Sequence, residues 1–288
     1  MTPPQASVAL VYDFDGTLAP GTMQEQSFLP AVGTDGQTFW PEAKALAQLH
    51  DMDEILAYMQ LMLKKAGDSN TRSTRKAFEG YGAKITFFPG VETWFDRINA
   101  YANDIGVTTS HFIVSSGNRE TIQGTTIARH FKHIWASSFQ YDANDVAVWP
   151  ALVVNYTSKA QHLFRINKGV FNSWENEKVN AYVEEKDRPF PFKNFIYFGD
   201  GDTDIPAMKM VTYQGGKSIV VYSPSKSGAA AEAHKLVENH RADIAVPADY
   251  LLDSALDKAV KAAMQQIASR HAFERCDTSP LKGLRPPK

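Results

Sequence analysis

The chain of 288 residues contains a single cysteine, Cys276, which excludes a disulfide within the chain and a zinc site built from cysteines. An excess of positive charge is also missing, because 30 Lys and Arg face 32 Asp and Glu, for a net charge of -2. No broad basic surface is therefore expected to attract nucleic acid or an anionic membrane. We expect neither as a partner, and a reducing compartment fits the single cysteine.

Long apolar runs are absent as well. The first apolar segment, Val8–Tyr12, ends at Asp13, and no basic segment precedes it. Such a run is too short for a signal peptide or a membrane-spanning helix, so we expect a soluble, cytoplasmic protein. The overall composition, 43% hydrophobic and 22% charged residues, is that of a globular protein and excludes a disordered chain.

Five short apolar segments have the composition of buried β-strands. They cover residues 8–12, 112–114, 195–198, 218–222 and 243–246. Between them, helical spacing of apolar residues recurs after Pro89-Gly90, from Ala229 to Glu238 and from Ser254 to Ala268. Strands that alternate with helices predict an α/β fold with a Rossmann-like, doubly wound parallel sheet, whose ligands bind outside the carboxyl ends of the strands.

Two segments interrupt this alternation. Residues 21–83 contain no convincing strand but carry a helical stripe, so we predict a mainly helical insertion there; the stripe consists of Leu46, Leu49, Met52, Leu56, Met59 and Leu63. Residues 134–166 contain turn residues between β-branched and aromatic flanks, which predicts a β-hairpin, followed by a helix from Phe171 to Val183. The predicted domains are a core of residues 1–20 and 84–275, a helical cap of residues 21–83, and a loose tail of residues 276–288.

The first motif whose side chains could take part in catalysis or binding is Asp13-Phe14-Asp15-Gly16-Thr17, at the end of the first strand. Side chains alternate along a strand, so Asp13 and Asp15 are expected on the same face. Two adjacent carboxylates are unfavourable unless a cation or a proton lies between them. Taken alone, however, an Asp-Gly turn explains the motif equally well.

A second acidic motif, Gly199-Asp200-Gly201-Asp202-Thr203-Asp204, follows the third apolar segment. Three carboxylates in five positions indicate a hard cation with oxygen ligands, either Mg²⁺ or Ca²⁺. An EF-hand would require Gly at position six and Glu at position twelve of the loop. Counted from Asp200, those positions hold Ile205 and Val211, so an EF-hand is excluded.

Two further features could bind an anion. Ser115-Ser116-Gly117-Asn118 follows the second strand, where hydroxyl and backbone N–H groups can cradle a phosphate, although a simple helix cap is an alternative. A lysine is also expected before the third apolar segment, residues 195–198. The candidates are Lys159, Lys168, Lys178 and Lys193. We predict Lys168, because it lies between the predicted hairpin and the predicted helix, near the strand ends.

In this order, the motifs resemble those of the haloacid dehalogenase superfamily of phosphohydrolases. The resemblance covers Asp13-Phe-Asp15-Gly-Thr, Ser115, Lys168 and Gly-Asp200-x-x-x-Asp204. The phosphoserine-phosphatase-like branch of that family carries a helical cap after the first motif, where the insertion of residues 21–83 lies. The resemblance implies a Rossmann-like core with an inserted cap that closes over the site.

The resemblance also implies roles for these residues. Asp13 would attack phosphorus and form an aspartyl-phosphate, while Asp15 would protonate the leaving oxygen and later deprotonate water. Mg²⁺ would bind Asp13, the Asp15 carbonyl and Asp200, with Asp204 as a further ligand or as a residue that orients the metal shell. Ser115, or its neighbours Ser116 and Gly117, would bind the phosphoryl oxygens. Lys168 would offset their negative charge.

The resemblance therefore implies a Mg²⁺-dependent phosphatase that hydrolyses a small phosphomonoester. The paired Asp13 and Asp15 favour ester hydrolysis over cleavage of a carbon–halogen bond. Phosphoserine phosphatases carry a glutamate soon after the first motif, but the nearest one here, Glu25, comes about three residues late, which speaks against phosphoserine as the substrate. The alternatives are phosphotransfer to an acceptor other than water and a non-catalytic regulator that binds Mg²⁺ or phosphate.

Overall fold

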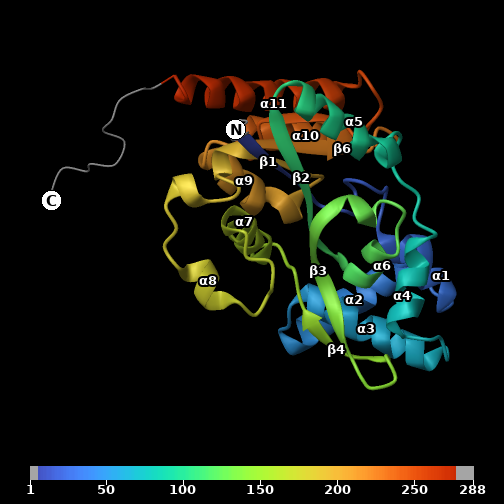
Figure 1. Cartoon of the computed structure of the whole chain (residues 1–288). Coiled ribbons are helices and arrows are strands. Elements are labelled where there is room, and N and C mark those ends of the chain that lie inside the picture. The colour runs from blue at the N-terminus through green and yellow to red at the C-terminus, as the bar shows by residue number, and fades with distance from the viewer. Residues whose placement is uncertain (1–5, 277–288) are drawn as a thin grey trace.

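A computed structural model describes residues 6–276 (Figure 1). Its centre is one seven-stranded sheet with the strand order β4-β3-β2-β1-β5-β6-β7. The strands are β1 (Ala6–Tyr12), β2 (Val107–Asn118), β3 (Phe131–Tyr141), β4 (Ala147–Leu152), β5 (Phe195–Gly199), β6 (Lys217–Tyr222) and β7 (Ile244–Pro247). All neighbouring strands are parallel except β3 and β4. The predicted doubly wound α/β fold is confirmed.

The apolar runs of the strands are continuous because helices cover both faces of the sheet. Val8, Leu10 and Tyr12 of β1 lie in one core, with α5 (Val91–Asp104) and α11 (Ala255–Glu274). The alternate residues of β1 lie in a second core, which contains residues of α7 (Ser158–Lys168), α9 (Ile205–Tyr213) and α10 (Ala229–Glu238). Figure 1 shows α5 and α11 on one side of the strands and α7 and α9 on the other.

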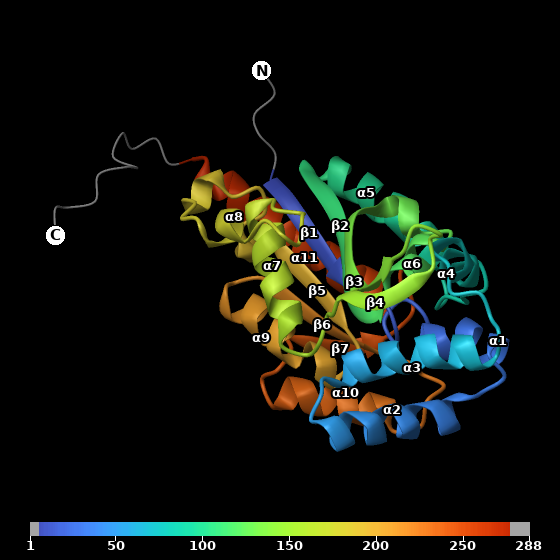
Figure 2. The same ribbon diagram turned by 90° about the horizontal axis from the view of Figure 1, so that it is seen from below.

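The insertion between β1 and α5 is helical, as the sequence predicts. It contains η1 (Gln24–Phe28), α1 (Leu29–Ala31), α2 (Gly36–His50), α3 (Glu54–Asp68) and α4 (Arg75–Gly82). The predicted stripe is wrong in detail, because Leu49 is 76% exposed and the chain breaks at Asp51, whose φ of 48° is left-handed. Helices α2 and α3 lie side by side (Figure 2), and their buried residues include Phe39 and Ala43 of α2 and, on α3, Ile55 and Met59, of which only Met59 belongs to the stripe.

The predicted hairpin is present as β3 and β4, joined by a turn over residues 142–146. The first half of β3 was not predicted as part of the central sheet, but it pairs in parallel with β2. The second half packs on the helical insertion, where the rings of Phe139 and Phe78 stack at 5.2 Å. The division into a core and a cap at residues 21–83 stays a prediction, and the apolar centre of that insertion includes the hairpin.

The predicted helix from Phe171 to Val183 is wrong. The helix of this region is α7, which ends earlier at Gly169 with a left-handed φ of 68°. Beyond it lies only the short α8 (Asn176–Asn180). The remaining short elements are α6 (Arg119–Gln123), η2 (Ala128–His130), η3 (Glu185–Asp187), η4 (Phe192–Asn194) and η5 (Asp202–Asp204).

Cys276 is exposed and has a free thiol. The rest of the predicted tail, residues 277–288, lies outside the described residues. Within residues 6–276, none of the helices combines the length and the apolarity that crossing a bilayer requires.

His162 on α7 provides a test of the packing. Its ring is buried beside Trp135, neither ring nitrogen has a hydrogen-bond partner among the described residues, and burial lowers its pKa to about 3. Below the ordinary pKa of about 6.5, the unfolded chain therefore takes up a proton that the native protein does not. The native protein should lose about 2 kcal/mol of stability through this group between about pH 7.5 and pH 5.

We expect His162→Leu to remove this loss, because the substitution breaks no hydrogen bond. Urea unfolding of the wild type and the variant near both pH values measures the difference. The stability of the variant relative to the wild type should improve by about 2 kcal/mol at the lower pH. A difference that does not change with pH would show that His162 titrates normally in the native protein. Carboxylates that titrate in the same range are common to both proteins and cancel in this comparison.

Candidate active site

The polar ends of three neighbouring strands meet at one cavity of about 800 Å³. Asp13 follows β1, Ser115 and Ser116 lie near the end of β2, and Asp200 follows β5. These strands are adjacent and parallel in the order β2-β1-β5, so their carboxyl ends share one edge of the sheet. All four residues line the cavity. The predicted site is thus brought together from segments nearly 190 residues apart (Asp13 to Asp200).

Asp13 is held in a fixed orientation at the floor of this cavity. Its backbone N–H donates to the carbonyl of Phe198, which continues the ladder between β1 and β5. One carboxylate oxygen accepts a hydrogen bond from the N–H of Phe14 at 2.7 Å. The other accepts one from the ammonium of Lys159 at 2.7 Å. The residue is only 5% exposed, so the orientation of its side chain is set before any ligand arrives.

The lysine at the site is Lys159, in the first turn of α7. Its ammonium is fully buried and donates to Asp13 at 2.7 Å, to Asp204 at 2.8 Å and to the Thr203 hydroxyl at 3.3 Å. Burial alone would lower the pKa of Lys159, but the two carboxylates outweigh it and raise the pKa above its usual value. The ammonium therefore remains charged between two acidic side chains.

The predicted placement of Lys168 near the strand ends is wrong. Lys168 lies in the last turn of α7, and its ammonium donates to the backbone carbonyls of Val179 and Ala181, both at 2.6 Å. The error follows from the misplaced helix: the lysine at the start of the real helix reaches the site, whereas the lysine at its end does not. Helical spacing of Lys159, Leu163 and Ile166, all buried, was the signal available in the sequence.

Asp15 and Gly16 form a tight turn after Asp13. The carboxylate of Asp15 accepts a hydrogen bond from the N–H of Met23 at 2.8 Å. Desolvation, followed by the negative charge of Asp13, raises the pKa of Asp15 well above its usual range. Gly16 has a φ of 71°, and a Cβ there would lie 2.0 Å from a carboxylate oxygen of Asp200. Glycine is therefore needed to let Asp200 approach this turn.

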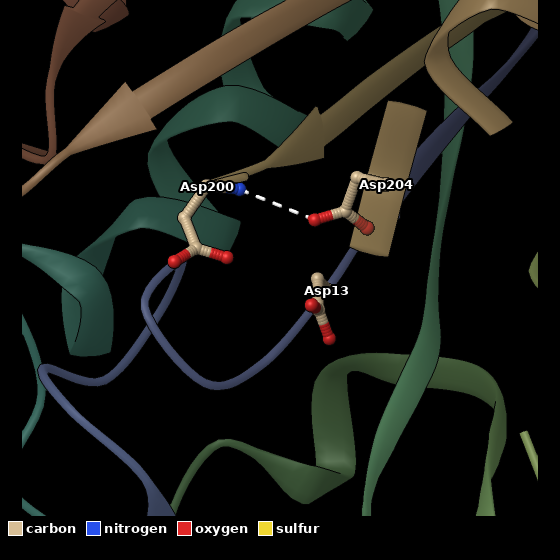
Figure 3. Close-up of side chains that lie close together, drawn as sticks. All are labelled: Asp13, Asp200 and Asp204. Carbon is tan, nitrogen blue, oxygen red and sulfur yellow. Dashed lines mark hydrogen bonds between the residues drawn. The ribbon is translucent and has the colours of Figure 1, made fainter. Parts of the chain in front are cut away.

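Asp13, Asp200 and Asp204 form an acidic cluster, in which one oxygen of each lies within 4.8 Å of the others (Figure 3). Desolvation, and then the charges of Asp204 and Asp13, raise the pKa of Asp200 above its usual range. This electrostatic cost is what a bound cation would relieve. Three carboxylate oxygens at such spacing are a donor set that suits Mg²⁺, so the residues fit the predicted metal.

Asp204 differs from the other two because it is fully buried and does not line the cavity, and both of its oxygens already have partners. One accepts hydrogen bonds from Lys159 and from the Tyr197 hydroxyl at 2.6 Å. The other accepts one from the N–H of Asp200 at 3.3 Å, the contact drawn in Figure 3. Between the two roles considered for Asp204, these contacts favour orienting its neighbours over direct binding of the metal.

Ser115, Ser116 and Gly117 line the wall opposite Asp200. The hydroxyl of Ser115 accepts a hydrogen bond from the N–H of Gly117 at 3.1 Å, which leaves its proton free to be donated. The buried hydroxyl oxygen of Ser116 has no partner among the described residues. Either serine can therefore donate to a ligand, and both remain candidates for binding phosphate.

The helical insertion is connected to the start of α7 through Asn155. Its side-chain amide donates to Asp53, the N-cap of α3, at 2.7 Å. Its side-chain oxygen accepts a hydrogen bond from the N–H of Ser158 at 2.9 Å, in the turn that carries Lys159. The placement of Lys159 thus depends on the contact between the insertion and the core, a link that the sequence did not suggest.

The family of the chain follows from this fold, these motifs and a comparison with known families. The family model of haloacid dehalogenase-like hydrolases matches residues 10–209, which is more than half of the chain. The protein belongs to this family, and the predicted membership is confirmed. The matched span includes the aspartate pair after β1, the serines near the end of β2, α7 and the acidic motif after β5.

The chain is also similar to individual proteins and solved structures. An uncharacterized protein of Borreliella burgdorferi is 30% identical over 228 residues, which cover 71% of this chain and 78% of the relative. A probable phosphoserine phosphatase of Vibrio cholerae is 12% identical with a TM-score of 0.56, and the match covers 92% of this chain and 67% of that one. A substrate-bound phosphoserine phosphatase is 13% identical with a TM-score of 0.52, over 84% and 93% of the two chains. The two structures are similar to this protein in fold.

Proposed function

We propose that this hydrolase is a Mg²⁺-dependent phosphatase that cleaves a small phosphomonoester through an aspartyl-phosphate. The observation that carries the proposal is the Asp13 carboxylate, oriented at the cavity floor by the N–H of Phe14 and the ammonium of Lys159. A carboxylate is a recognised covalent nucleophile, and a fixed ammonium beside it offsets the repulsion between two anions. The phosphatases of similar fold are consistent with this reaction.

The reaction is assigned to the residues as follows. An oxygen of Asp13 attacks phosphorus, the ester P–O bond breaks, and Asp15 gives its proton to the departing alkoxide. Water then attacks the phosphorus of the aspartyl-phosphate and gives a proton to Asp15. The bond to Asp13 breaks, which releases inorganic phosphate and restores both carboxyl groups. The hydroxyl of Ser115 or Ser116 holds phosphoryl oxygens during both steps, and the N–H of Gly117 orients the Ser115 hydroxyl.

The metal is assigned to Asp13, the backbone carbonyl of Asp15 and Asp200. Mg²⁺ bound there would neutralise charge on the phosphoryl oxygens and orient them for attack. Asp204 would act without binding the metal, by holding Lys159 and the backbone of Asp200. Because the Asp200 carboxylate lies against Gly16, both acidic motifs are positioned by one contact.

Phosphotransfer to an alcohol or sugar would use the same groups, so water as the acceptor is part of the proposal. A regulator that only binds Mg²⁺ or phosphate is less consistent with the site, because binding alone does not require a carboxylate aimed into the cavity beside Asp15. The substrate is proposed to be a small phosphorylated metabolite in the cytoplasm. Added alcohols distinguish transfer from hydrolysis through the appearance of a new phosphate ester.

Phosphate release from a panel of phosphomonoesters, with Mg²⁺ and with EDTA, tests the proposal. We expect release from at least one ester, its loss in EDTA and its recovery when Mg²⁺ is restored, because the acidic cluster needs a cation. Asp200→Asn should raise the Mg²⁺ concentration required for half-maximal activity by about tenfold or more. Asp104→Asn, at an exposed carboxylate outside the cavity, is the control for loss of a carboxylate. Full activity in EDTA would contradict a metal-dependent mechanism.

A further inference from the structure

The cavity extends from the aspartates in an unexpected direction. Its lining includes Gly21, Thr22 and Phe88 but none of residues 23–87, where the helices between β1 and α5 lie. The lining continues instead past Tyr222 and Ser223 at the end of β6 and along α10. The helical insertion closes against β2, where the Tyr58 hydroxyl donates to the carbonyl of Ser116. The free space beside the phosphoryl site therefore lies over the core, toward α10.

This part of the cavity is basic, unlike the end that holds the aspartates. Lys226, Lys235 and Arg241 line it, with Glu232 as its acidic residue. We call these three cations the basic arm. Within residues 6–276, no side-chain hydrogen bond, ion pair or ring contact engages any of them. All three side chains are exposed, so a ligand in the cavity can reach them without displacing an existing partner. The basic arm thus has unused capacity to bind an anion.

The arm begins close to the phosphoryl site. Strand β6 pairs in parallel with β5, with Gly199 opposite Val220, so the loop after β6 emerges beside Asp200. Lys226 lies in that loop, just before α10, while Lys235 and Arg241 lie along and after the helix. A phosphoryl group held at Asp13 and Ser115 leaves the remainder of its ester in the space that leads to these cations. Unpaired cations in a cleft favour a ligand of opposite charge.

We propose that the substrate is a phosphomonoester whose leaving group carries a second anionic group, bound by the basic arm. This inference rests on the proposed function for the position of the phosphoryl group. It places the recognition of the leaving group on the β6–α10 segment of the core and not on the helical insertion. Partly exposed charge contacts of this kind are individually weak, so three together should change the affinity by about tenfold.

The test uses pairs of esters that differ in one charge. Alkyl phosphates of four to eight carbons with a terminal carboxylate are compared with their methyl esters. In the wild type we expect KM to be about tenfold lower for the carboxylate at the best chain length, with similar kcat. The triple variant Lys226→Gln, Lys235→Gln, Arg241→Gln should remove this preference, because KM for the carboxylate rises to that of its methyl ester. The chain length at the optimum reports how far from Asp13 the anion binds.

A matched control removes the same charge elsewhere. Lys44→Gln, Lys64→Gln and Lys258→Gln change exposed lysines outside the cavity, so this triple variant should retain the preference. Equal KM values for the two esters in the wild type, at every chain length, would overturn the inference while leaving phosphatase activity intact. A preference that survives in the first triple variant would also overturn it, because another group would then bind the carboxylate.

Binding without turnover separates this inference from the proposed function. Calorimetric titration of the same esters into Asp13→Asn protein, with and without the three arm substitutions, requires no hydrolysis. Tighter binding of the carboxylate that depends on the arm supports the inference even if no ester is cleaved by the wild type, an outcome that would refute only the proposed function. Equal binding of both esters refutes the inference whatever the activity.

Discussion

Replacing Asp13 with asparagine is expected to reduce phosphate release by at least about a thousandfold while the protein stays folded. Asparagine has nearly the same shape, and its side-chain oxygen can still accept a hydrogen bond from Phe14 or Lys159. A neutral amide, however, cannot form the acyl phosphate on which the mechanism depends. The loss should appear in kcat for every ester of the panel.

Initial rates and a thermal melt of the same sample measure the effect. Asp145→Asn, in the exposed turn between β3 and β4, is the matched control and should keep full activity. Mass spectrometry of acid-quenched wild type should find a phosphoryl group on the peptide that contains Asp13, and none on the variant. Near-normal release by Asp13→Asn would refute covalent catalysis by this carboxylate.

The second large effect is expected at Lys159. Lys159→Met keeps the length of the side chain but removes the ammonium that contacts Asp13 and Asp204. Loss of one such preorganised donor should lower kcat/KM by about 100- to 1000-fold. Two buried carboxylates also lose their counter-charge, so the melting temperature should fall. Mg²⁺ should restore part of this stability if it binds the same carboxylates.

Lys168→Met is the internal control, because the two lysines lie on the same helix. Its ammonium contacts the carbonyls of Val179 and Ala181, so the variant should lose some stability in that loop but retain activity within about twofold. Initial rates of both variants, with unfolding curves, decide between the two lysines. Equal losses of activity would show that the effect comes from the stability of α7 and not from the contact with Asp13.

The contrast between these lysines shows where sequence reasoning was sufficient and where it was not. Asp13, Asp15, Asp200 and the serine pair could be located because each directly follows an apolar strand, and parallel strands bring their carboxyl ends to one edge. Lys159 has no such marker. It precedes β5 by more than 30 residues, so its position depends on where α7 begins. Because the helix of this region was predicted at residues 171–183, Lys168 was chosen in place of Lys159.

The predictions for β3 and for the helical stripe failed for related reasons. Half of β3 lies in the central sheet and half in a hairpin, so a single turn signal described only the second half. In the insertion, a left-handed residue between α2 and α3 resets the helical phase, and a stripe counted across it selects Leu49, which faces solvent. Periodicity predicts which face is buried only while the backbone remains one continuous helix.

By itself, the sequence determined the alternation of buried strands and helices, the family of the protein, and the acidic and serine residues of the site. These properties are local, since each depends on the pattern within one segment or on residues next to a strand end. The tertiary structure alone decided which lysine is paired with Asp13, that both oxygens of Asp204 are occupied, and that the cavity opens toward Lys226 and Arg241. These depend on contacts between distant segments, where small differences in the start of a helix or the path of a loop move a side chain by several ångströms.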